Sequence, residues 1–287
     1  MTRRDVALRA CGCAAAGLFF TAMVGCTAER GAEGGAGGSH TPAASPAPPV
    51  SSAAPPSPTS TAPPAPGATA VSLVPDLDES KQPKTAAEAQ ALLDRIVITE
   101  DAFGPDVVRR TPFESSPGRW PVLDERCVWQ TTGLPPDVLA TNTRYFQIPA
   151  GNGHGRVQIN ATVTVHHNRA ESGWETARAM EEVVRCPDQK LREGEELKGL
   201  LGTVNHQGEQ LNNWSEDAFS EFGTYVGPQG GEPQSYFWYQ AQFGPVTVAI
   251  AGKGAEGFKQ ETLSQLVVQG NSRMLAQAKQ VLGKAAG

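Results

Sequence analysis

The clearest pattern along the chain is an alternation of apolar and polar residues between positions 156 and 167. Apolar side chains occupy positions 157, 159, 161, 163 and 165, and Gln, Asn and Thr occupy the positions between them. A period of two is typical of a β-strand with one buried and one wet face. The pattern predicts a strand here, with its odd positions in the core.

Helical spacing appears in three segments. In residues 85–96, Thr85 is the expected N-cap and Glu88 completes a capping box. In residues 172–186, we expect Ser172 and Glu175 to do the same, with Pro187 ending the helix. The apolar stripe of this second helix, which includes Trp174, Ala177 and Val184, is expected to face inward.

The third helix is expected over residues 258–282, with a kink or break at Gly270-Asn271. Shorter strands are expected at 126–131, 144–148 and 218–226, and the glycine-rich stretch 151–155 reads as a loop between strands. Residues 235–254 read as a hairpin that turns at Gly244-Pro245. The order predicts an α+β domain: an antiparallel sheet of about six strands with flanking helices, which we expect on one face.

The N-terminus has the marks of an export signal. Arg3, Arg4 and Arg9 precede an apolar run that ends at Cys26, too short for a bilayer span, which needs ~20 apolar residues. The ending "MVGC" resembles the bacterial lipobox, although Met replaces the usual Leu. We therefore expect a signal peptide over 1–25 and a diacylated Cys26 that holds the protein on the outer face of the cell membrane. A plain signal peptide and a twin-arginine export route remain open.

Residues 26–84 are expected to form a disordered tether. Five glycines lie between positions 31 and 38, and ten of the 23 prolines lie between positions 42 and 66. Such a segment buries too little apolar surface to offset its ordering entropy, and it would reach roughly 40 Å as a coil. The folded domain is expected over 85–287. The sequence leaves open whether the tether is glycosylated.

Cysteine and charge content narrow the chemistry. The domain holds two cysteines, Cys127 and Cys186, and in an oxidising compartment we expect them to form a disulfide. The chain carries 24 Lys and Arg against 30 Asp and Glu. The segment 1–84 is balanced, so the acidic excess lies in the domain, which argues against a nucleic-acid binder.

Catalytic motifs are absent from the sequence, and we expect neither enzymatic activity nor a cofactor or metal. His166 and His167 are adjacent on the expected strand, so they point to opposite faces and cannot chelate one ion together. His167 would join Val165 on the apolar face, while His166 would lie on the polar face.

The aromatic stretch "YFWY" is the stronger functional lead. Tyr236 and Trp238 share one face of the expected strand, and Phe237 and Tyr239 share the other. One pair belongs to the core, and the other is either covered by a helix or exposed for binding. We expect a shallow groove on the helix-free face of the sheet, lined by Tyr236, Trp238, Thr164 and His166. Burial of the first two under the C-terminal helix is the alternative.

Several of these features recur together in one known family. In this order and spacing the chain resembles the extracellular sensor domain of actinobacterial PknH-type serine/threonine kinases, a domain also found alone in secreted lipoproteins. The features that carry the resemblance are Cys127, Trp129, Trp174, Ala177, Cys186 and the hairpin 235–252, within residues 85–285. It implies an antiparallel sheet with flanking helices, a cleft and a ligand-sensing role without catalysis. The chain departs from the family in having two domain cysteines where members often have four, and no kinase domain accompanies it.

Two functions follow as hypotheses. The first is a lipid-anchored, non-catalytic binding or sensing module whose partner is a cell-wall or small-molecule ligand; its oligomeric state is open. The second is a cell-envelope hydrolase or transferase with an unrecognised site. A Ser, Asp or Glu in a cleft within reach of His154, His166 or His206 would favour the enzyme. An aromatic groove without such a pair would favour binding.

Overall fold

The folded domain is built on a large antiparallel sheet. The computed structural model describes residues 73–206 and 212–285. The sheet order is β1-β4-β5-β10-β9-β8-β7-β6, and a separate hairpin pairs β2 with β3. The strands are β1 (Val108–Glu114), β2 (Arg119–Leu123), β3 (Trp129–Gly133), β4 (Val138–Ile148), β5 (Val157–His166), β6 (Gln189–Arg192), β7 (Glu195–His206), β8 (Asp217–Val226), β9 (Gln234–Phe243) and β10 (Val246–Lys253). The predicted α+β class is confirmed, with eight strands in the sheet where about six were expected.

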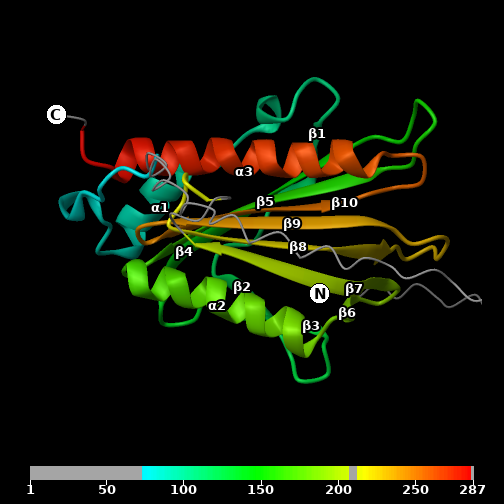
Figure 1. Ribbon diagram of the computed structural model, residues 1–287, viewed down its shortest axis with the longest axis horizontal. Coiled ribbons are helices and arrows are strands. Elements are labelled where there is room, and N and C mark those ends of the chain that lie inside the picture. Colours follow the sequence, from blue (N-terminus) through cyan, green and yellow to red (C-terminus); the bar gives the residue numbers. More distant parts are fainter. Residues whose placement is uncertain (1–72, 207–211, 286–287) are drawn as a thin grey trace, which may run out of the picture. The chain divides into compact units, whose positions relative to one another are not determined.

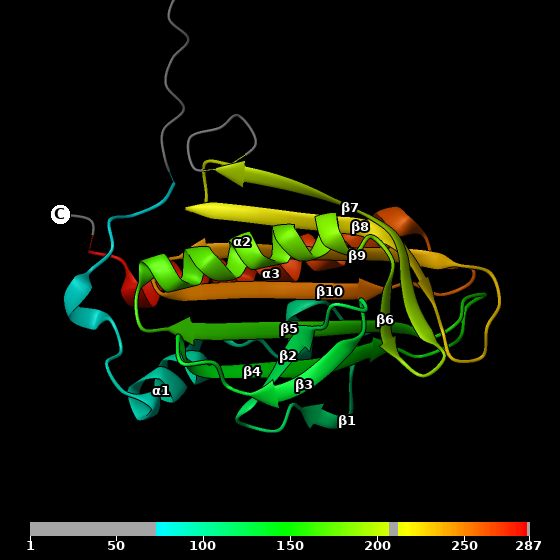
Figure 2. The ribbon, with the colours of Figure 1, turned by 90° about the horizontal axis from the view of Figure 1, so that it is seen from below.

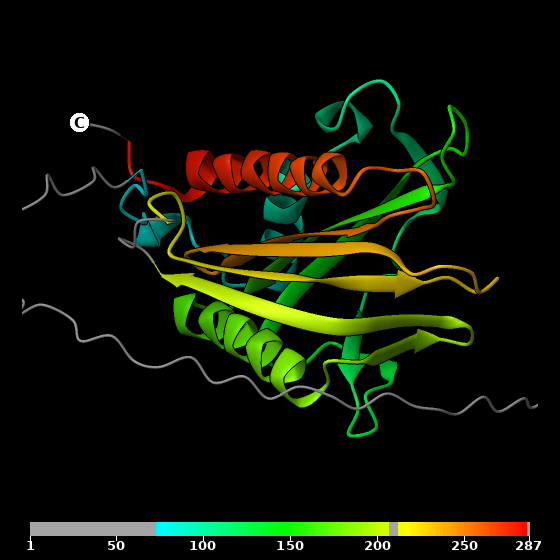
Figure 3. The same cartoon turned by 45° about the vertical axis from the view of Figure 1, so that its right-hand side comes forward.

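Helices cover both faces of the sheet. They are α1 (Ala86–Ile96), α2 (Arg169–Arg185) and α3 (Gln260–Leu282), with short 3-10 turns η1 (Glu79–Lys81) and η2 (Glu100–Ala102). Figures 1 and 3 show α3 on one side of the sheet and α2 on the other. Figure 2 shows the β2–β3 hairpin on the same side as α2. The expectation that helices pack on one face was wrong.

The alternation in β5 explains the main core. Its odd residues, from Val157 to Val165, are buried in one apolar cluster with residues of α1 and α3 such as Leu93 and Met274. The even residues face α2 instead. They looked like a wet face in the sequence because they are polar, but they meet a helix whose inner side is also polar. No helix in the described residues is long and apolar enough to span a membrane.

The first helix begins as predicted. Thr85 Oγ1 accepts from Glu88 N, and the Glu88 carboxylate accepts from Thr85 N, so the capping box is confirmed. Residues 73–84 fall within the expected tether but contact the end of α3. Leu77 bridges Gly283, and Asp78 N donates to Leu282 O at 2.9 Å. This segment has no apolar periodicity of its own, so its packing could not be read from its composition.

The second helix differs from its prediction. It begins after Asn168, whose side chain accepts from two backbone N–H groups. Ser172 is therefore inside the helix, where its Oγ donates to Gly244 O at 2.7 Å. Trp174 is 65% exposed and Val184 is 85% exposed, so the expected inward stripe was wrong. The sheet beneath the first half of α2 is polar, so the helix turns its Ser and Thr residues toward it.

The third helix is continuous through Gly270-Asn271, where a kink or break was expected. Gly270 lies so close to the Phe103 ring that an added Cβ would stand 2.5 Å from it. Asn271 Nδ2 donates to Tyr239 O and Val248 O at 3.0 and 2.8 Å. Both residues thus serve helix–sheet contact instead of interrupting the helix.

The remaining strand predictions hold with shifted ends. The expected strand 126–131 begins only at Trp129, and the expected strand 144–148 is the second half of β4. The 235–254 hairpin is confirmed, and Gly244 takes a left-handed φ of 55° in its turn. His167 is exposed after the end of β5, with Nε2 3.0 Å from Pro136 O, so its predicted core position was wrong. Cys26 and the predicted signal peptide lie outside the described residues.

Candidate ligand-binding cleft

A cleft of about 570 Å³ lies on the α2 side of the sheet. Its floor comes from β4, β5, β8, β9 and β10, one wall comes from α2, and the opposite wall comes from the β2–β3 hairpin and β6. Figure 2 shows this arrangement, with α2 and the hairpin side by side over the sheet. The cleft exists because α2 covers only part of this face.

Threonine hydroxyls form one part of the floor. Thr141 and Thr164 are cross-strand partners with their Oγ1 atoms 3.2 Å apart, and Thr143 and Thr162 are partners at 2.9 Å. Cross-strand hydroxyl pairs of this kind stabilise neighbouring strands. They also give the floor polar atoms that remain within reach of a ligand.

Aromatic side chains form the other part of the floor. Tyr236 and Trp238 lie on the α2 face of β9 and line the cleft, while Phe237 and Tyr239 pack into the core under α3. Tyr236 is 8% exposed and Trp238 is half-buried. The Trp238 ring lies 5.9 Å from that of Phe219 in an edge-on arrangement. The pair under the C-terminal helix is thus Phe237 and Tyr239.

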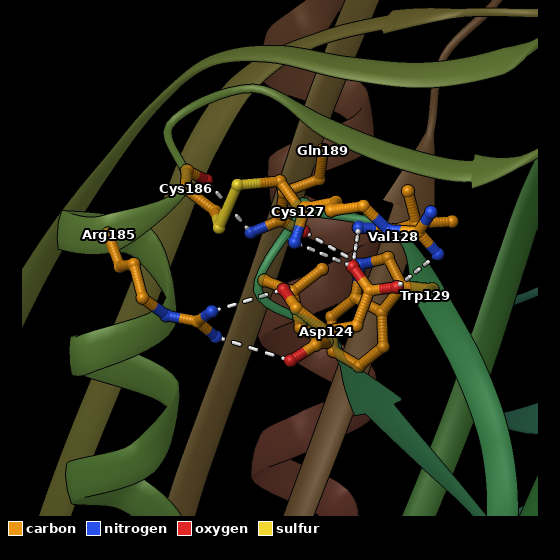
Figure 4. Close-up of a disulfide and its surroundings, with 9 residues drawn as sticks. Asp124, Cys127, Val128, Trp129, Arg185, Cys186 and Gln189 are labelled. Atoms are coloured by element: carbon orange, nitrogen blue, oxygen red, sulfur yellow. Dashed lines mark hydrogen bonds and ion pairs between the residues drawn. A yellow bond between two sulfur atoms is a disulfide. The ribbon is translucent and has the colours of Figure 1, made fainter.

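A disulfide fixes the hairpin wall. Cys127 and Cys186 are bonded, with Cα atoms 5.5 Å apart, which confirms the predicted pair (Figure 4). Cys127 lies in the turn before β3 with a φ of 60°, and Cys186 is the C-cap of α2. The bond therefore joins the two walls of the cleft at one end.

Hydrogen bonds around the disulfide orient the aromatic wall. Trp129 Nε1 donates to Gln189 Oε1 at 2.8 Å, and Gln189 Nε2 donates to Cys186 O at 3.2 Å (Figure 4). Arg185 donates to the carbonyls of Leu123 and Asp124. Trp129 lines the cleft together with Trp120 of the same hairpin. The hairpin thus presents indole rings toward the floor.

His166 was expected in the groove, but it does not line the cleft. Its side chain is fully buried, with Nε2 2.6 Å from Glu175 Oε2 and Nδ1 3.2 Å from Asp137 O. Thr247 Oγ1 donates to the same Glu175 oxygen at 2.6 Å. Glu175 lines the cleft, so a carboxylate does stand within reach of a histidine, as the enzymatic hypothesis required. Both nitrogens of His166 are occupied, however, and the ring has no exposed surface with which to meet a substrate.

The other two histidines bring no such pair into the cleft. His206 Nδ1 lies 2.7 Å from Asp217 Oδ1, and His154 Nδ1 lies 2.7 Å from Gly155 O. None of these residues lines the cleft. Within residues 73–206 and 212–285, no group of three His, Cys, Asp or Glu residues is placed to hold a metal ion.

Two glutamates that the sequence did not single out are the most perturbed groups of the cleft. Glu221 on β8 is 8% exposed, and burial raises its pKa from 4.5 to about 8, with a further contribution from Glu182. Burial likewise raises the pKa of Glu182 on α2 to about 7. A readable signal existed for Glu221, because it alternates with Phe219 and Tyr225 on the inward face of its strand. Its convergence with Glu182 depends on how α2 lies over the sheet.

The remaining charged groups of the lining have partners or face solvent. Arg178 pairs with Asp137, Glu114 pairs with Arg144, and Glu175 is held by His166 and Thr247. Arg119 is exposed. Perturbed carboxyls in a cleft are a physical mark of functional sites.

Comparisons with known proteins add little to this geometry. No protein-family model matches the chain, and no curated protein matches it. The solved extracellular domain of PknH from Mycobacterium tuberculosis aligns with 68% of this chain and 98% of its own length. The identity is 12% and the TM-score is 0.37, so the resemblance is weak and nothing about the cleft follows from it.

Proposed function

We propose that this protein is a lipid-anchored, extracytoplasmic binding or sensing module whose cleft takes a small organic ligand or a piece of the cell wall. The observation that carries the proposal is the cleft between α2 and the disulfide-fixed hairpin, with Tyr236 and Trp238 in its floor. Its volume of about 570 Å³ falls in the range of small-molecule sites. Aromatic rings give contact area at low conformational cost. Thr164 supplies a polar contact beside them.

The address rests on the sequence. A basic leader, a short apolar run and the lipobox-like ending at Cys26 support export and lipidation. Two acyl chains hold a protein firmly on a membrane, whereas one does so only marginally. The Gly- and Pro-rich segment after Cys26 would then extend the domain away from the membrane surface.

A ligand screen by thermal unfolding tests the binding role. The probe set contains sugars, wall-derived peptides, amines and fatty acids, added to the chain from Thr27 to Gly287 made in an oxidising compartment. A ligand of the native state raises the melting temperature. We expect Trp238→Ala to lose the shift, and Trp174→Ala on the outer face of α2 to keep it. Hits that shift both variants like the wild type would place binding elsewhere and contradict the cleft assignment.

One observation favours the enzymatic alternative, a cell-envelope hydrolase. Glu182 and Glu221 stand in one cleft with raised pKa values, as a general acid requires. Glycoside hydrolysis also needs a second, ionised carboxylate. Both free carboxyls are shifted toward the protonated form, while Glu175 and Glu114 are engaged with other residues. Release of reducing ends from cell-wall glycan by the wild type, and its loss in Glu182→Gln, would establish this alternative over the binding role.

A further inference from the structure

Glu221 is a buried carboxyl without a partner. Its residue is 8% exposed and lines the cleft, and no hydrogen bond or ion pair to its carboxyl occurs within residues 73–206 and 212–285. Buried carboxylates elsewhere in the domain are paired; Glu195, for example, binds Arg192 and Lys253. An unpaired buried carboxyl is costly, because it loses hydration and gains no compensating contact. Its place in the cleft points to a ligand as the missing partner.

A second carboxyl lies close to it. Glu182 reaches the same cleft from α2 and also makes no side-chain hydrogen bond or ion pair in the described part of the chain. The two carboxyls influence each other electrostatically across the cleft. The cationic groups of the lining are otherwise occupied or exposed, because Arg178 pairs with Asp137 and Arg119 faces solvent. The cleft thus offers negative charge without a positive counterpart.

Aromatic faces surround these carboxyls. Trp238 is the cross-strand partner of Glu221, and Tyr236 precedes it on the same face of β9. Trp129 stands on the facing wall. Aromatic faces attract organic cations within about 6 Å of the ring centroid, and Trp is the most effective of them. Charge and rings therefore favour the same class of ligand.

We propose that the cleft selects an organic cation, an ammonium group held by Glu221 and Glu182 and flanked by Trp238. This inference rests on the proposed binding function and specifies its ligand class. A cation supplies the counter-charge that the two carboxyls lack. A neutral sugar would leave that charge uncompensated.

Choline and its uncharged isostere 3,3-dimethylbutan-1-ol are a matched pair of probes. Both are added to residues 27–287 in the oxidised form, and binding is followed by tryptophan fluorescence and calorimetry. We expect choline or the polyamine spermidine to bind saturably, and the neutral isostere to bind at least about tenfold more weakly than choline. Glu221→Gln should weaken choline binding by a similar factor, while Glu193→Gln at an exposed position should leave it unchanged.

The pH dependence gives a second readout. Choline keeps its charge at every pH, so its affinity should rise from pH 6 to pH 9 as the carboxyls ionise. In Glu221→Gln the rise should shrink to the part that Glu182 contributes. The other titratable and charged groups facing the two carboxyls are Arg178, Arg185 and Glu175 on α2 and Tyr236 on β9.

The outcomes separate the two levels of the proposal. If sugars or other neutral compounds bind in a Trp238-dependent way and the cations do not, the cation assignment falls and the binding function stands. Affinity that falls as pH rises would also overturn it, because the protonated carboxyl would then be the binding form. If no probe binds in a Trp238-dependent way, both proposals fail.

Discussion

Glu221 on β8 and Trp238 on β9 are directly opposite each other in the sheet register. Cross-strand partners point their side chains to the same face, so the carboxyl and the indole share the floor of the cleft. Glu182 of α2 completes the group from the other side. An unpaired acid beside an aromatic ring is the relationship on which the proposed ligand class depends.

Burial of Glu221 makes the stability of the domain pH-dependent. Its pKa is about 8 in the folded state against an ordinary value of 4.5. The folded protein holds this proton more tightly than the unfolded chain does. The free energy of unfolding is therefore highest below about pH 4.5 and falls as pH rises toward 8, by ~1.4 kcal/mol for each pKa unit.

Glu221→Gln removes this titration, so we expect a flatter stability profile. At pH 8.5 the variant should be more stable than the wild type by at least ~1 kcal/mol, because it no longer buries an unpaired charge. Urea unfolding between pH 5 and pH 9 measures both profiles, with Glu193→Gln as the exposed control. Parallel profiles for the wild type and Glu221→Gln would contradict the assignment.

Two helical glycines should respond to Ala in opposite directions. At Gly270, a Cβ would stand 2.5 Å from the buried Phe103 ring, so Gly270→Ala should destabilise the domain by ~1–3 kcal/mol. At Gly173, the nearest atoms would be 3.7 Å away on the Gln242 side chain. Gly173→Ala should therefore stabilise by ~0.5–1 kcal/mol through helix propensity. Chemical denaturation of both variants measures the contrast, and equal shifts would refute it.

The disulfide should contribute to both stability and the cleft. Cys127 and Cys186 are 59 positions apart, and the chain-entropy model gives roughly 4 kcal/mol for a loop of this length. Replacing both with Ala should lower the free energy of unfolding by ~2–4 kcal/mol. Ligand affinity should fall as well, because the Trp129 wall loses its covalent link to α2. Free thiols in the exported protein, or an unchanged unfolding midpoint in the double variant, would count against this role.

Cys26 is expected to carry the membrane anchor. Metabolic labelling with a palmitate analogue should mark the wild type and leave Cys26→Ser unlabelled. The variant should also appear in the medium, because it lacks the acyl chains that hold the protein on the membrane. Equal labelling of the two proteins would contradict lipidation at this position.

The sequence by itself determined the features that depend on local chemistry. The alternation from Val157 to Val165 specified β5 and its core face, because strand side chains alternate with a period of two. Thr85 and Glu88 specified the start of α1, because a capping box needs only residues three apart. The same local turn chemistry located the β9–β10 hairpin at Gly244. Pairing of Cys127 with Cys186 followed from there being two cysteines in the domain.

Tertiary structure decided which face each element turns inward and what meets in the cleft. Trp174 and Val184 were expected inside, but α2 turns Ser172 and Thr176 inward because the sheet beneath offers Gln242 and Gln240. The face of Trp238 was undetermined, because both faces of β9 carry aromatic residues. Glu182 and Glu221 are 39 positions apart, and only the packing of α2 across the sheet brings them into one cleft. Their meeting depends on long-range packing, which no local periodicity encodes.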